Sequence, residues 1–95
     1  MTIVVTIQYY NVLRRAAGFE EEEMTMLSGS SVRDALARLS ATGSPALRDL
    51  LFSPDGKIVS HLVVFRNRKL VTRDRFDIEL VDGDELKLFP AVSGG

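Results

Sequence analysis

The sequence contains no cysteine and no tryptophan, and His61 is the single histidine among its 95 residues. Without cysteine the chain cannot form disulfides, bind a metal through thiolates or use a cysteine nucleophile of its own. One histidine excludes a metal site built from several histidines and gives little support to a serine–histidine–aspartate triad. The sequence therefore predicts a protein with little catalytic equipment and no metal site.

Charge and hydropathy exclude further classes of protein. The 12 basic and 13 acidic residues give a net charge of -1, so there is no strongly basic surface for nucleic acid and no acidic block typical of disorder. The longest apolar runs are far shorter than the ~20 residues that cross a bilayer, and no signal-peptide pattern is present. We expect a cytoplasmic protein with neither nucleic acid nor membrane as a partner.

The first half of the chain predicts a hairpin followed by a helix. Residues 3–10 are mostly β-branched or aromatic and form a strand, and residues 22–27 form a second, antiparallel strand after a helical turn over 12–16. A capping box of Ser31 and Asp34 then begins a helix over 32–40. The residues expected to face the core are Ile3, Val5, Ile7 and Tyr9 of the strand and Val32, Ala35, Leu36 and Leu39 of the helix.

The second half predicts a short helix, two strands, a brief strand or turn, and a last strand, over residues 45–51, 61–65, 70–71, 78–81 and 85–89. A hairpin, a helix and further strands predict an α+β protein in which one main helix packs on a mixed sheet, the β-grasp or ubiquitin-like fold. A split βαβ ferredoxin-like fold would need a second full helix near the C-terminus. We expect residues 1–90 to form the domain and residues 91–95 a flexible C-terminal tail.

The end of the chain carries the most specific motif. A D-G-D-E turn at residues 82–85 leads through the last strand to Phe89-Pro90 and to Gly94-Gly95. This stretch resembles the MoaD/ThiS family of ubiquitin-like sulfur carriers. Residues 51–57 and 61–67 resemble a subgroup that includes archaeal small modifier proteins. Glycines have no Cβ, so they allow another protein's backbone to approach the tail closely.

The resemblance implies chemistry at the last residue. A MoeB-like adenylating enzyme of the ubiquitin-activating type would use ATP to adenylate the carboxylate of Gly95, and a sulfur donor such as a cysteine desulfurase or rhodanese would convert it to a thiocarboxylate. The chain would then be the small subunit of molybdopterin synthase beside a MoaE-like large subunit, a co-substrate without a permanently bound cofactor. The alternatives are a modifier conjugated through Gly95 to target lysines, or a carrier for cysteine, thiamin or tRNA thiolation.

A partner-binding surface is expected beside the tail. Alternation along the last strand directs Leu86 and Leu88 to the core and Phe89 outward, whereas both sets of the 61–65 strand are apolar and compete for the core. We expect Phe89 and Val64 to form an apolar docking patch, unless Phe89 folds back onto its own sheet edge. The tail and partner-binding residues are then Val64, Phe89, Pro90, Ala91, Val92, Ser93 and Gly94, with Gly95 as the reacting group.

Overall fold

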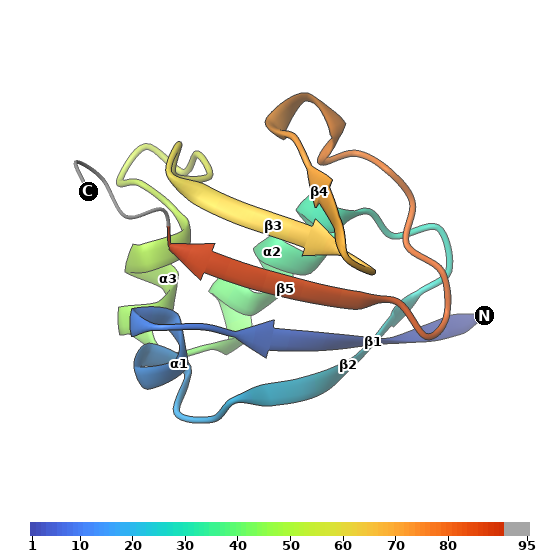
Figure 1. Ribbon diagram of the computed structural model, residues 1–95, viewed down its shortest axis with the longest axis horizontal. Coiled ribbons are helices and arrows are strands. Elements are labelled where there is room, and N and C mark those ends of the chain that lie inside the picture. The colour runs from blue at the N-terminus through green and yellow to red at the C-terminus, as the bar shows by residue number, and fades with distance from the viewer. Residues whose placement is uncertain (91–95) are drawn as a thin grey trace.

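The computed structural model describes residues 1–90, and the tail residues Ala91, Val92, Ser93, Gly94 and Gly95 lie outside the described part. In chain order the elements are β1 (Thr2–Tyr9), α1 (Val12–Ala17), β2 (Glu21–Leu27), α2 (Val32–Thr42), α3 (Pro45–Leu51), β3 (Leu62–Arg66), β4 (Lys69–Val71), the 3-10 helix η1 (Arg73–Arg75) and β5 (Glu85–Pro90). The strands β1 and β2 and the strands β3, β4 and β5 form a single sheet, and the helices α2 and α3 lie between these two groups along the chain (Figure 1).

The five strands lie in the order β2-β1-β5-β3-β4. The central strands β1 and β5 are parallel, and the other neighbouring pairs are antiparallel. Figure 1 shows α2 behind the sheet, so one face of the sheet is covered by helix and the other faces the viewer. The predicted mixed sheet with one main helix on one face is confirmed, and with it the β-grasp fold.

The helices begin where the sequence predicts. The backbone N–H of Asp34 donates to the Ser31 hydroxyl at 3.1 Å, and the Ser31 N–H donates to the Asp34 carboxylate at 2.9 Å, which completes the capping box of α2. Ser44 caps α3 by accepting from the Leu47 N–H at 3.1 Å. Its hydroxyl also donates to the carbonyl of Ala16 at 2.7 Å, so the same residue connects α3 to α1.

The core lies between α2 and the sheet. All the strand and helix residues that the sequence assigned to it are buried, and so are Leu86 and Leu88 of β5. On α3, Leu47 and Leu51 are buried as well. In the part of the chain that the structure describes, no helix is long and apolar enough to cross a membrane.

The segment between β4 and β5, where a brief strand or turn was expected over residues 78–81, contributes no strand to the sheet in the described chain. Its contribution to strand pairing is one isolated bridge between Ser31 and Glu79. The carbonyls of Phe76 and Ile78 instead accept hydrogen bonds from the N–H groups of Arg33 and Val32, at 2.8 and 3.2 Å. These donors have no partner within α2, because the first N–H groups of a helix lack a preceding turn. The segment therefore closes the start of α2 and buries Phe76 in the core.

Candidate functional site

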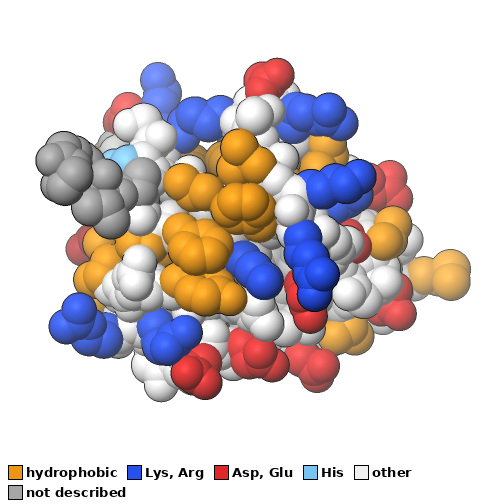
Figure 2. All heavy atoms as spheres, in the orientation of Figure 1, with side chains coloured by type: hydrophobic (Ala, Val, Ile, Leu, Met, Phe, Trp, Pro, Cys, Tyr) orange, Lys and Arg blue, Asp and Glu red, His pale blue; other side chains and the backbone are white. Residues whose placement is uncertain are grey.

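The outer face of the sheet carries an apolar surface near the end of β5. We call this surface the aromatic patch, and it consists of Tyr10, Val63, Phe65, Leu70 and Phe89. Figure 2 shows hydrophobic side chains gathered in the middle of this face. Leu70 is 58% exposed, and the other four side chains are partly exposed. An apolar group of this kind on an otherwise polar surface is typical of a protein–protein contact.

Phe89 is the centre of the aromatic patch. Its ring stacks on that of Tyr10 with the centroids 4.2 Å apart, and it meets the edge of Phe65 at 5.7 Å. Strand register also places Val63 directly opposite Phe89. Stacked and edge-to-face rings attract one another beyond their buried area. Phe89 is thus held by its neighbours on the outer face, and the prediction that it points outward is confirmed.

The expectation for Val64 is wrong. Val64 pairs with Leu88 of β5 and is fully buried, whereas Val63 and Phe65 point outward. Both sets of this strand are apolar, so alternation could not decide between them. The antiparallel register with β5 does decide, because residues directly opposite each other share a face of the sheet. Val63 and Phe65 therefore replace Val64 in the predicted docking surface.

The aromatic patch lies where the chain leaves the sheet. Phe89 immediately precedes Pro90, the last residue of β5, which is opposite Leu62 of β3. Any protein that covers Phe89 therefore contacts the residue next to the start of the C-terminal tail. The predicted site residues Ala91 to Gly95 themselves lie outside the described residues.

A buried polar network supports the far end of β5. The Asp84 side chain is 3% exposed and accepts from the Asn67 side-chain amide at 2.7 Å and from the Val81 N–H at 2.8 Å. Asn67 lies in the two-residue turn between β3 and β4, and its side-chain oxygen accepts from the Glu85 N–H at 2.9 Å. The D-G-D-E turn of the sequence therefore fixes the β3–β4 turn against the first residue of β5.

Opposite charges border the patch on its two sides. Along the β2 edge, Glu21 and Glu23 share the outer face with Thr25, and Glu21 accepts from the Gln8 side chain at 3.3 Å. At the β4 edge, Arg68 and Lys69 are exposed. Figure 2 shows acidic side chains along the lower border of this face, next to two basic ones at its left end, and mostly basic side chains along the upper border. The face therefore has a charge polarity across it.

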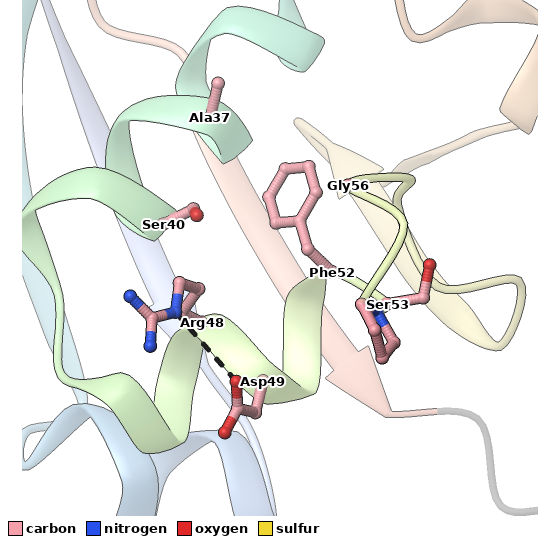
Figure 3. Close-up of a pocket in the computed structure, with 8 residues that line it drawn as sticks. Ala37, Ser40, Arg48, Asp49, Phe52, Ser53 and Gly56 are labelled. Atoms are coloured by element: carbon pink, nitrogen blue, oxygen red, sulfur yellow. Dashed lines mark ion pairs between the residues drawn. The ribbon is translucent and has the colours of Figure 1, made fainter.

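A cleft lies elsewhere, between α2, α3 and the segment that follows α3 (Figure 3). It has a volume of about 630 Å³, and Phe52 reaches into it toward Ala37. Its charged pair, Arg48 and Asp49, is exposed and 3.9 Å apart. Residues 1–90 contain no group of three or more potential metal-ligating side chains, and His61 is exposed.

Comparison with known proteins agrees with this geometry. A model of the ThiS family matches residues 7–95. The chain is also 35% identical over 83 residues to small archaeal modifier protein 1 of Haloferax volcanii. This match covers 87% of this chain and 91% of that protein. The chain belongs to the ThiS family. It is a small ubiquitin-like protein of the sulfur-carrier and small-modifier class, whose members are carriers and not catalysts.

Solved structures of this ThiS family member's relatives share its fold. The crystal structure of SAMP1 from Haloferax volcanii has a TM-score of 0.85 and 32% identity over 97% of this chain and 99% of that chain. The putative molybdopterin converting factor subunit 1 of Pyrococcus furiosus has a TM-score of 0.75 and 26% identity, over 95% of this chain and 99% of that chain. Subunits 1 and 2 of this factor from Helicobacter pylori were solved as a complex. One chain of that complex matches with a TM-score of 0.61 and 19% identity, over 98% of this chain and 100% of that chain, which is a likeness of fold alone.

Proposed function

We propose that this ThiS family protein is a sulfur carrier whose Gly95 carboxylate is activated by a separate ATP-dependent adenylating enzyme. A free carboxylate is a poor acyl donor, because its charge must be lost before a nucleophile can add. Transfer of AMP from ATP releases pyrophosphate and supplies a good leaving group. A persulfide donor displaces AMP to form an acyl disulfide, and a thiol of the sulfur-transfer machinery then cleaves the S–S bond, is itself oxidised to a disulfide, and leaves the thiocarboxylate on Gly95. ATP belongs to the activating enzyme in this scheme, and this chain is the co-substrate.

The observation that carries the proposal is the aromatic patch at the base of the tail. Phe89 is central in the patch and is followed at once by Pro90. Proline fixes φ near −65°, which reduces the conformational freedom at the start of the tail and the entropy lost on binding. Docking on the patch would therefore direct residues 91–95 toward the partner. Gly94 and Gly95 have no Cβ and would enter a narrow channel.

We propose molybdopterin synthesis as the destination of the sulfur. The likeness to the Pyrococcus furiosus converting factor subunit supports this assignment. The chain would then act as the small subunit beside a large subunit that holds the pterin precursor. A protein of the same fold, subunit 1 of this factor in Helicobacter pylori, forms a complex with subunit 2, and we propose a partner of this kind here.

A second fate, conjugation to protein lysines, is favoured by a different observation. The relative with 35% identity is a small archaeal modifier protein, and the similarity covers 91% of that protein. The same acyl-adenylate serves both fates, because either a sulfur or a lysine amine can displace AMP. Deleting Gly94 and Gly95 would abolish both.

Mass spectrometry of the protein from its native cells separates the two fates. Replacement of one carboxylate oxygen by sulfur identifies the carrier, whereas high-mass adducts that disappear on deletion of Gly94-Gly95 identify the modifier. Loss of molybdoenzyme activity in a deletion strain, restored by the wild-type gene alone, would assign the sulfur to molybdopterin. If neither modified form is present and the deletion has no phenotype, the proposal is wrong.

The role of the aromatic patch is tested with Phe89→Ala in an ATP–pyrophosphate exchange assay with the adenylating enzyme from the same genome. A central aromatic of an interface contributes about 2 kcal/mol or more, which corresponds to a loss of about 30-fold in kcat/KM. Leu27→Ala is the matched control, since Leu27 is 70% exposed on β2 and outside the patch. Equal activity of the two variants would refute docking on the patch.

A further inference from the structure

We propose that Lys87 determines which partners can dock on the aromatic patch, and that a true partner places a carboxylate against its ammonium group. This inference rests on the proposed function, because it concerns the surface through which the carrier would meet its activating enzyme. It adds the chemistry of that enzyme's surface, namely an apolar contact area that contains an acidic side chain.

The position of Lys87 sets it apart from the other lysines. It lies on the outer face of β5, between Gln8 of β1 and Phe65 of β3, and on the same face as Phe89. Its side chain is partly buried, whereas Lys57 and Lys69 are exposed. A basic group therefore adjoins the aromatic patch from within the sheet.

No acidic side chain in the described chain pairs with this ammonium group. The ion pairs within residues 1–90 join Arg14 to Glu20, Arg33 to Asp77, Arg48 to Asp49 and Arg66 to Asp84. Glu85 lies on the same face of β5, two residues before Lys87, and forms no ion pair with it, while the acidic β2 edge is separated from β5 by β1. Water therefore solvates the charge of Lys87 in the free protein.

Docking changes the surroundings of this charge. A protein that covers Phe89 and Phe65 removes water from Lys87, which lies opposite Phe65 and two residues before Phe89. Burying an ammonium group without a partner is strongly unfavourable, whereas a carboxylate in contact with it compensates. A protein whose surface is apolar but has no acidic side chain therefore binds weakly, and the cost of burying Lys87 unpaired distinguishes it from a true partner.

The same charge argues against a second copy of this chain as the occupant. Two copies joined by this face about a two-fold axis would bring two ammonium groups together near the centre of the contact. The exposed basic residues Arg68 and Lys69 at the β4 edge add to the positive potential on that side. An acidic partner fits both features, because its carboxylates meet Lys87 and the β4 edge together.

The test measures ATP–pyrophosphate exchange by the adenylating enzyme of the same genome with Lys87→Glu, Lys87→Met and Lys87→Arg as substrates. We expect Lys87→Glu to raise KM by about 30-fold or more with kcat almost unchanged, because Lys87 acts in docking. Lys87→Met also raises KM, since it leaves the partner's acid unpaired, and Lys87→Arg retains most of the affinity. Lys57→Glu changes the net charge equally on an exposed turn and leaves KM unaltered.

The outcomes separate this inference from the proposed function. If the wild type is adenylated and Lys87→Met has a KM equal to or lower than that of the wild type, the partner has no carboxylate opposite Lys87. The inference is then wrong, while the proposed function stands. If the wild type is not adenylated, both are wrong. Sedimentation of the wild type, with Lys87→Met for comparison, supplies a second readout, since dimerisation of the wild type through this face would also overturn the inference. Urea unfolding of each variant confirms that the fold is intact.

Discussion

The substitution Asp84→Ala should destabilise the fold strongly, although it alters a single small side chain. Asp84 is 3% exposed, and its carboxylate accepts from the Asn67 amide at 2.7 Å and from the Val81 N–H at 2.8 Å. The Arg66 guanidinium lies 3.9 Å from the same carboxylate. Alanine would remove these contacts and leave the Val81 N–H and the Asn67 amide without their acceptor.

The size of the effect follows from these contacts. A hydrogen bond to a charged group contributes about 1.5–3 kcal/mol, and a buried donor left unpaired adds a desolvation penalty. Two such bonds give an expected loss of at least about 3 kcal/mol from a total stability of about 5–15 kcal/mol. For a domain of this size, this loss lowers Tm by at least about 12 °C. Asp84→Asn should lose nearly as much, because its amide N–H₂ would face another donor.

Urea unfolding followed by far-ultraviolet circular dichroism measures the loss, since the chain has no tryptophan to serve as a fluorescent probe. The control is Asp49→Asn, which removes a carboxylate from an exposed ion pair of 3.9 Å and should cost less than about 0.5 kcal/mol. A loss below about 1 kcal/mol for Asp84→Ala, with an unchanged m-value, would refute the argument that this carboxylate holds the two turns together.

Two further variants test the turn and the buried tyrosine. Asn67 and Arg68 have φ values of 50° and 74° in the two-residue β3–β4 turn, so Arg68→Gly should stabilise the fold by about 0.5–1 kcal/mol in urea, while Arg68→Ala should not. Burial raises the pKa of Tyr9, helped by the 2.5 Å hydrogen bond that its hydroxyl donates to Glu22 and by the charge of Glu22. The unfolded tyrosine ionises near pH 10, so stability should fall above that pH by up to ~1.4 kcal/mol per pH unit. Tyr9→Phe should show a shallower alkaline decline, and an identical slope would contradict the assignment.

The sequence predicted the fold because its elements carry strong local signals. The capping box at Ser31 and the apolar spacing of 32–39 place α2, and strict alternation in β1 selects the buried set. The last strand is equally clear, since Leu86 and Leu88 alternate with polar or aromatic residues and Pro90 ends the pattern. These signals depend on residues a few positions apart, so pairing partners were not needed to interpret them.

The docking surface was harder to predict, because it depends on contacts between distant strands. Tyr10 belongs to the more polar set of its strand, and its role is set by the stacking with Phe89. Val63 and Val64 are both apolar, and the register with β5 alone determines which of them is outside. The buried position of Phe76 is similar, since it lies in a charged segment whose place is fixed by the start of α2.

The alternation along β5 allows one short strand to contribute both to the core and to the proposed docking surface. Leu86 and Leu88 are fully buried in the core, while Lys87 and Phe89 alternate with them on the outer face. Because successive residues of a strand point to opposite faces, each role can vary without loss of the other. The strand then continues directly through Pro90 into the tail. A partner that binds Lys87 and Phe89 would therefore contact the chain just before the tail begins, at a strand whose position is fixed by the buried Leu86 and Leu88.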